Sequence, residues 1–322
     1  MKISYKIVKI TAKWLIIGLA YTFLVYKLIC FDKYDSLLNE WTKMPVSQVW
    51  WFGYVLALLP INWMLEAIKW RRLLLTIEKL NWTNTIKGVV AGITTGFFTP
   101  NRVGEMAGRI VYLPEEKRKA GVTACLLNSI TQNTIMTVCG IPACIIFFSN
   151  TQGGIESDMA GFLLLMILLS LGLITLYWLL PKIGDKLSNS NLSDKAKAFI
   201  ICLKYYSKRD LIVMMGISLG RYIVFCTQFY CMLHFFGINL SIWQALIAIP
   251  SNYLLVTFTP SLAYSEAAVR SSASLLFIGA YSSKVVNIAL AGISIWAVNF
   301  VIPMIIGTLV MLLDKSISNS TN

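Results

Sequence analysis

The sequence predicts an all-α, polytopic membrane protein with six full spans and two broken helical hairpins that re-enter the membrane from opposite faces as an inverted repeat. Hydrophobic residues make up 57% of the 322 residues and charged residues only 13%, against about 25% charged residues in soluble domains. Six apolar stretches are long enough to cross a hydrocarbon core of roughly 30 Å. Two further apolar regions are each interrupted by a Thr-Pro pair.

The six predicted spans are about 20 apolar residues or longer, the length that a spanning helix needs. They cover about 12–30, 46–68, 121–148, 160–180, 211–236 and 286–312. Four lysines precede the first stretch, as in a signal peptide, but the stretch is long for that role and no small-x-small cleavage site follows it. We therefore expect the first stretch to be retained as a span.

The two broken regions are residues 84–113 and 243–281. In each, an apolar run ends at Thr-Pro, a cluster of small and charged residues follows, and a second run begins. Proline removes a backbone donor and breaks a helix near the preceding turn. Each region is therefore predicted to form a hairpin that enters the membrane and returns to the same side.

The basic residues set the expected orientation. With the N-terminus inside, 20 of the 28 Lys and Arg fall on the cytoplasmic side and four on the other. Both termini are then cytoplasmic, in an inner membrane, and residues 182–210 form a cytoplasmic linker with a short amphipathic helix. The net charge of +13 is explained by topology, so we expect no nucleic-acid partner.

An internal repeat relates the two broken regions. Phe98-Thr99-Pro100 is followed by Glu105 and Arg109, and Phe258-Thr259-Pro260 is followed by Glu266 and Arg270. The repeats extend over about 46–148 and 211–312, within a single integral membrane domain of residues 1–322. Three spans separate the copies and reverse their orientation. Opposed broken helices of this kind indicate a binding site near the membrane midplane.

Each break offers chemistry suited to an anion. The half-helix after the proline presents unpaired N–H groups and the positive end of its dipole, with Thr99 and Thr259 as expected caps. Arg102 can bind phosphate oxygens in a bidentate way. The alternative is that the i,i+4 pairs of Glu and Arg only neutralise their helices. The predicted binding residues are Thr99, Pro100, Asn101, Arg102, Glu105, Arg109, Thr259, Pro260, Ser261, Glu266 and Arg270.

A second group of polar residues lies on neighbouring spans: Glu66, Asn128, Gln132 and Arg221. Glu66 is interpreted either as part of the site or as the partner of Lys69 or Arg71. The single histidine, the seven cysteines without a CxxC pair and the absence of GxxxxGK[ST] and GxGxxG motifs predict no metal site, no cofactor and no nucleotide-driven pump.

These residues carry a family resemblance. The runs 100–105 (PNRVGE) and 69–74 (KWRRLL), and the later Pro260 to Glu266, resemble the lysylphosphatidylglycerol synthase transmembrane-region family, also called the flippase-like domain family. The resemblance covers about residues 10–312. It implies a polytopic bacterial or archaeal protein that moves an aminoacylated phosphatidylglycerol across the inner membrane, with Arg102, Glu105 and Glu266 in the headgroup path.

Three departures from the family pattern bear on the substrate. Asn101 stands where the family usually has glycine, and Ser261, Ala263 and Ser265 replace a glycine-rich second motif. Both changes could reshape the headgroup pocket. The soluble transferase domain of the full synthases has no counterpart in this sequence, so we expect no catalysis of lipid aminoacylation.

The preferred hypothesis is a lipid flippase, not an enzyme, that moves an anionic or aminoacylated phospholipid, or a polyprenyl-phosphate lipid, between leaflets by alternating access. Its partners would be that lipid and a lipid-modifying enzyme; the sequence does not indicate an oligomeric state. Two alternatives stay open. One is a membrane-embedded transferase acting on a lipid-linked substrate, and the other is a non-transporting scaffold of envelope synthesis.

Overall fold

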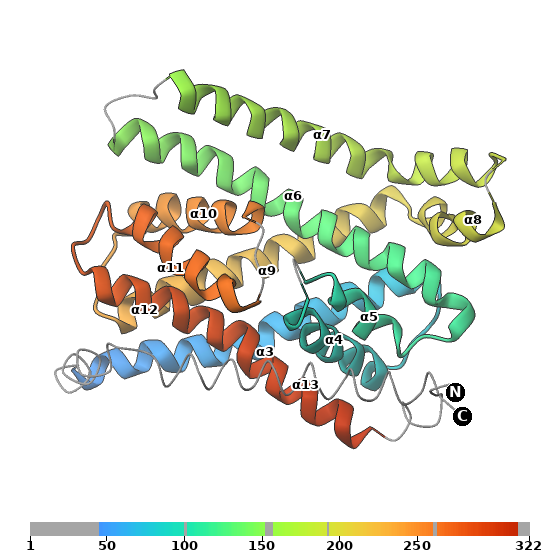
Figure 1. Ribbon diagram of the computed structural model, residues 1–322, viewed down its shortest axis with the longest axis horizontal. Helices are drawn as coiled ribbons and strands as arrows, with labels where there is room; N and C mark the ends of the chain where they lie inside the picture. The colour runs from blue at the N-terminus through green and yellow to red at the C-terminus, as the bar shows by residue number, and fades with distance from the viewer. Residues whose placement is uncertain (1–44, 100–101, 152–156, 192, 260–262, 315–322) are drawn as a thin grey trace, which may run out of the picture.

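The structure is a computed structural model that describes residues 45–99, 102–151, 157–191, 193–259 and 263–314 (Figure 1). Helices account for nearly all of this part of the chain, and it contains no β-strand. The all-α prediction is thereby confirmed for the described residues.

The helices follow one another with short connections. Their bounds are α3 (Val46–Leu74), α4 (Trp82–Phe97), α5 (Gly104–Ile110), α6 (Arg118–Thr151), α7 (Ser157–Ser188), α8 (Asp194–Ile200), α9 (Lys208–Phe235), α10 (Ile242–Phe258), α11 (Ala263–Ile278), α12 (Val285–Trp296) and α13 (Ile302–Leu313). Short 3₁₀ turns cover Glu115–Lys117 and Ile201–Tyr205, and a π-helical turn, Ala297–Val301, joins α12 to α13.

Five helical segments in the described residues are long and apolar enough to cross a membrane. They are Val46–Leu74, Glu115–Thr151, Leu164–Ser188, Lys208–Phe235 and Val285–Leu313, and they coincide with five of the six predicted spans. The sixth prediction, residues 12–30, lies outside the described residues. In Figure 1 these long helices run roughly along the longest axis of the molecule.

Both broken regions contain two helices separated by a break. Helices α4 and α5 pack closely against each other, and so do α10 and α11. Figure 1 shows the two pairs at opposite ends of the bundle. The first helix of each pair ends just before the Thr-Pro position, at Phe97 and Phe258. The sequence therefore placed both breaks within a few residues.

Glycines allow α4 and α5 to approach this closely. Gly88, Gly92 and Gly96 recur every four residues on α4, and a Cβ atom on Gly92 would lie 2.7 Å from Cγ of Arg109. Across the hairpin, a Cβ atom on Gly108 would collide with the Ala91 carbonyl and the Thr95 hydroxyl. Small residues at such spacing let helix backbones come together in membranes.

Replacing Gly108 by alanine is therefore expected to destabilise the protein. The added methyl group meets backbone atoms that cannot move aside, and overpacking of this kind costs about 1–3 kcal/mol. The midpoint temperature of thermal unfolding in detergent measures it. Gly172→Ala on α7 is the matched control, because nothing lies within 4 Å of its Cβ position. Equal midpoints for the two variants would contradict the close approach.

Helix starts and ends follow local sequence signals. Ser207 and Asp210 form a capping box at the start of α9, and Ser241 and Gln244 form another at the start of α10. The α9 helix ends at Phe235, and Gly237 follows two residues later with a φ of +71°, a conformation that glycine adopts without a Cβ penalty.

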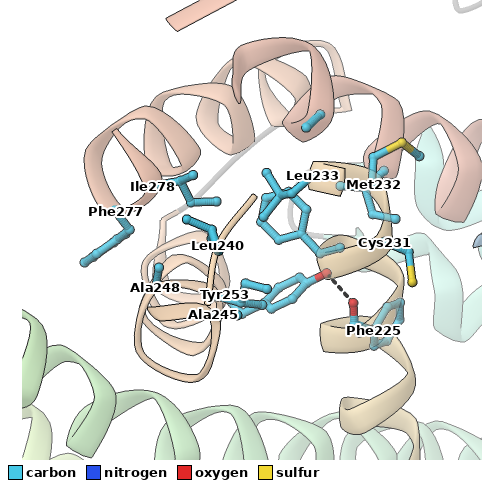
Figure 2. Packing of buried hydrophobic residues seen from close by; sticks show 14 of the residues in the cluster. Phe225, Cys231, Met232, Leu233, Leu240, Ala245, Ala248, Tyr253, Phe277 and Ile278 are labelled. Carbon is cyan, nitrogen blue, oxygen red and sulfur yellow. Dashed lines mark hydrogen bonds between the residues drawn. The ribbon is translucent and has the colours of Figure 1, made fainter. Parts of the chain in front are cut away.

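The largest apolar core lies between α6, α9, α10 and α12. Figure 2 shows Tyr253 of α10 crossing this core, with its hydroxyl donating to the Phe225 carbonyl of α9 at 3.1 Å. Phe277 and Ile278 of α11 pack into the same core. These contacts fix the second hairpin against α9, and so determine where its charged residues lie.

One boundary differs from the prediction. The helix predicted to end near residue 180 continues as α7 through Pro181 to Ser188, because an interior proline removes one hydrogen bond without always ending a helix. The remaining part of the predicted linker contains the short helix α8 and the turn Ile201–Tyr205.

Candidate functional site

A first group of charged residues surrounds Arg109 of α5, and we call Glu66, Glu105, Arg109 and Arg221 the α5 cluster. Arg109 is 1% exposed, and its Nη2 atom donates to Oε1 of Glu66 and Oε1 of Glu105. The second oxygen of Glu66 lies 2.5 Å from Nη1 of Arg221 on α9. A single buried carboxylate on α3 thus joins α5 to α9.

Asparagines complete the bonding of the α5 cluster. Asn128 Nδ2 donates to Oε1 of Glu66 at 2.9 Å, and Arg221 Nε donates to Oδ1 of Asn62 at 2.8 Å. Asn62 in turn donates to Oδ1 of Asn299 at 3.2 Å. The fully buried Lys69 donates from Nζ to the Asn128 carbonyl at 2.9 Å. Buried charges are tolerated only when paired and hydrogen-bonded in this manner.

A second group gathers around Glu266 of α11, and we call Arg102, Glu266, Arg270 and Phe300 the α11 cluster. Nε and Nη2 of Arg270 donate to Oε1 of Glu266 at 3.3 and 2.9 Å. Nε of Arg102 lies 3.8 Å from the other oxygen of Glu266. Glu266 therefore joins the break of the first hairpin to the second hairpin.

Arg102 has an unusual backbone. Its φ of +59° makes it the one non-glycine residue with positive φ among the described residues. For a side chain with a Cβ atom this left-handed conformation costs about 1–2 kcal/mol. Strain of this kind is commonly found at functional sites.

One cavity of about 530 Å³ joins the two clusters. Its volume is in the usual range for small-molecule sites. Charged side chains that line it are Arg102, Glu105, Arg109, Arg221, Glu266 and Arg270. Positive groups therefore outnumber carboxylates by two. The surplus of positive charge stays at two when Glu66 and Lys69, which are buried behind the wall, are also counted.

Several donors in the cavity wall have no hydrogen-bond partner among the described residues. They are Nε and Nη2 of Arg102, and Nε and Nη1 of Arg109. Guanidinium groups of this kind favour oxyanions such as phosphate. The wall therefore has both surplus positive charge and free donors.

Most of the predicted site residues line the same cavity, although they are far apart in the sequence. The cavity is lined by Thr99, Arg102, Glu105, Arg109, Asn128, Gln132, Arg221, Thr259, Glu266 and Arg270. Pro100, Asn101, Pro260 and Ser261 lie outside the described residues. Glu66 lies behind the wall and pairs with two arginines; the interpretation that it pairs with Lys69 or Arg71 is not what the contacts show.

The expected helix caps differ between the two hairpins. The Thr99 hydroxyl accepts a hydrogen bond at 2.7 Å from the N–H of Gly104, the first residue of α5. This N–H is therefore already used, whereas Nε and Nη2 of Arg102 have no hydrogen-bond partner among the described residues. The Thr259 hydroxyl instead donates to the Leu255 carbonyl of its own helix at 2.7 Å.

Three site residues escaped sequence reasoning. Asn62 carried no signal beyond being a polar residue in an apolar span. Asn299 is likewise one polar residue in an apolar span, yet it accepts a hydrogen bond from Asn62, which is 237 positions away in the sequence. Phe300 was one apolar residue among many in its span, and only its contacts with two arginines distinguish it.

The described cysteines and the other metal-binding side chains do not form a cluster of three or more. The described cysteines are free thiols, and burial raises the pKa of the Cys202 thiol, in the turn after α8, to about 11. No group of three or more His, Cys, Asp or Glu side chains comes together within the described residues.

The fold and the cavity define a multi-pass helical membrane protein with a charged internal site. A family model described as "Lysylphosphatidylglycerol synthase TM region" matches residues 12–307. The chain belongs to this family, which confirms the resemblance read from its motifs. Searches of curated proteins and of solved structures returned no significant match.

Proposed function

We propose that the protein binds the phosphate-bearing headgroup of a membrane lipid in the central cavity and moves that lipid between leaflets. The observation that carries the proposal is the surplus of two positive charges in the cavity wall. Charges inside a membrane protein are costly, and an uncompensated excess is expected where a ligand of opposite charge binds. One or two negative charges on a lipid phosphate would balance this excess.

The edge of the cavity supports an amphipathic ligand. Val103, at the start of α5, and Phe258, at the end of α10, line the cavity and are 59% and 36% exposed. An apolar rim beside a charged interior suits a molecule with a polar head and hydrocarbon tails. A small soluble anion would gain nothing from these two side chains.

The arrangement of the hairpins supports alternating access. We propose that α4–α5 and α10–α11 re-enter the membrane from opposite faces, with their breaks near the midplane. The headgroup would occupy the cavity while one hairpin or the other closes it. In this proposal the protein lies in the inner membrane with both termini cytoplasmic, and a lipid-modifying enzyme supplies the substrate.

The free donors favour this function over the two alternatives. In a scaffold all the charges would be packing pairs, whereas Arg102 and Arg109 each have two nitrogen atoms without a hydrogen-bond partner among the described residues. Guanidinium donors bind a phosphate group but do not accept a proton, so they support a transporter over a transferase.

Transport of fluorescent lipids in proteoliposomes tests the proposal. The purified protein is reconstituted with labelled phosphatidylglycerol, lysyl-phosphatidylglycerol or a polyprenyl phosphate, and movement is followed by quenching of the label in the outer leaflet. We expect at least one of these anionic or aminoacylated lipids to move faster than in protein-free vesicles. Movement of none of them would contradict the proposal.

Glu266→Gln is expected to reduce this movement to the protein-free background. The substitution removes the carboxylate shared by Arg102 and Arg270, so the two guanidinium groups would repel each other. Glu115→Gln is the matched control, since that side chain is 79% exposed and, within the part of the chain that the structure describes, pairs only with Arg118. Gel filtration checks that both variants are folded. Normal transport by a folded Glu266→Gln variant would show that the site is elsewhere.

A further inference from the structure

A π-helical turn interrupts the last long helix at the cavity. It covers Ala297–Val301, between α12 and α13. A π-turn holds one more residue than an α-turn, so it changes the direction in which the following side chains project. Asn299 and Phe300 of this turn both line the cavity. Turns of this kind occur often at functional sites.

The ring of Phe300 contacts two arginines that come from different hairpins. Cζ of Arg102 lies 3.6 Å from the ring centroid, and Cζ of Arg270 lies 4.9 Å from it. Both distances are within the range of a cation–π contact. Glu266 pairs with the same two arginines. The α11 cluster therefore holds two positive groups with one carboxylate and one aromatic ring.

We propose that Phe300 is a positioning residue that holds Arg102 and Arg270 at the cavity wall while leaving the Nε and Nη2 donors of Arg102 free for the phosphate of the ligand. The inference rests on the proposed function, and it adds a specificity-determining residue outside the charged motifs.

The physical reason lies in what an aromatic ring offers a cation. The face of the ring attracts a guanidinium through its quadrupole and takes up no hydrogen bond. A second carboxylate at this place would also hold the arginines, but it would occupy their donors and cancel the surplus charge. Consistent with this, Nε and Nη2 of Arg102 have no hydrogen-bond partner among the described residues although the group contacts Phe300 at close range.

The two hairpins are connected through the same ring. Arg102 lies at the break between α4 and α5, and Arg270 lies on α11. A phosphate that binds the free Nε and Nη2 donors of Arg102 can do so while the ring still contacts the guanidinium. The ligand would then lie next to the contacts that connect the two hairpins.

The test is a graded series at position 300, assayed in vesicles that contain labelled phosphatidylglycerol, lysyl-phosphatidylglycerol or polyprenyl phosphate. Phe300→Leu keeps the apolar volume and loses the ring, and Phe300→Tyr keeps the ring. We expect the half-saturating lipid fraction to rise about tenfold in Phe300→Leu and to stay within about twofold in Phe300→Tyr. Phe148→Leu, at a half-buried position away from the cavity, is the control.

Fluorinated phenylalanines separate the cation–π contact from packing. Mono-, di- and trifluoro-phenylalanine at position 300 change the volume little but weaken the quadrupole step by step. The half-saturating lipid fraction is expected to rise along the series. The inference would be overturned if the half-saturating lipid fraction stayed constant along the series, or if it were the same in Phe300→Leu as in the wild type. The proposed function would still stand as long as the wild-type protein transports lipid.

A double-mutant cycle keeps the inference testable if no lipid in the panel moves. Unfolding midpoints in detergent are compared for the wild type, Arg270→Met, Phe300→Leu and the double variant. Coupled residues give a change in the double variant that differs from the sum of the single changes. Additive midpoints would overturn the Phe300 contact, whereas coupled midpoints with no lipid movement would overturn the proposed function alone.

Discussion

Arg102→Gly is expected to abolish lipid movement while leaving the protein as stable as the wild type. The substitution removes the guanidinium that pairs with Glu266 and contacts Phe300. Glycine adopts the φ of +59° found at this position without the cost that a Cβ atom imposes. Transport should therefore be lost through the missing charge and not through unfolding, as measured by the proteoliposome assay and the unfolding midpoint.

Two further variants at this position separate charge from conformation. Arg102→Ala also loses the charge but keeps a Cβ atom at positive φ, so we expect it to be less stable than Arg102→Gly by about 1 kcal/mol. Arg102→Lys keeps the charge without the bidentate fork and is expected to retain partial transport. Wild-type rates in Arg102→Gly would remove this residue from the headgroup path.

Glu66→Gln is expected to be the most destabilising single substitution in the α5 cluster. The carboxylate is 1% exposed and lies between Arg109 and Arg221. Its neutralisation removes the carboxylate that both guanidinium groups contact. Breaking a buried ion pair in this way costs about 3–5 kcal/mol. The unfolding midpoint and the yield of monodisperse protein in detergent would both fall.

Glu105→Gln gives the comparison for Glu66. Its side chain is 27% exposed and contacts only Arg109 among the ion pairs of the described residues. Partly exposed pairs contribute less, so we expect a loss of about 1 kcal/mol. Equal losses for the two variants would show that Glu66 does not hold the cluster together.

The positions of the two helix breaks were predictable because they depend on local signals. Apolar length defines the spans, and the two Thr-Pro positions mark where α4 and α10 end. The i,i+4 spacing of Glu105 and Arg109, and of Glu266 and Arg270, already predicted two ion pairs, and the structure forms both. Such pairs require only one turn of a helix.

The long-range partners were not predictable from the same signals. Glu66 pairs with residues 43 and 155 positions away, and nothing in its own span indicates which arginine it meets. The nearer cation, Lys69, instead bonds to a backbone carbonyl of α6. Helix packing decides which arginines pair with Glu66, and hydropathy and charge counts carry no information on how the helices pack.

One signal was present in the sequence and was not used. Gly88, Gly92 and Gly96 are spaced by four, as are Gly104 and Gly108. This spacing predicts close backbone contact between α4 and α5. It would have placed Arg109 against α4, as the structure does.

The charge spacing also bears on how the chain is made. Each carboxylate of the two clusters has a cation three or four residues further on: Lys69 for Glu66, Arg109 for Glu105 and Arg270 for Glu266. A nascent helix leaving the ribosome can therefore enter the translocon as a nearly neutral segment, before distant partners exist. The structure keeps the pairs Glu105–Arg109 and Glu266–Arg270. Only Glu66 changes partner, from Lys69 to Arg109 and Arg221. Among the arginines of the two clusters, Arg102 and Arg221 have no carboxylate three or four residues before them in the sequence.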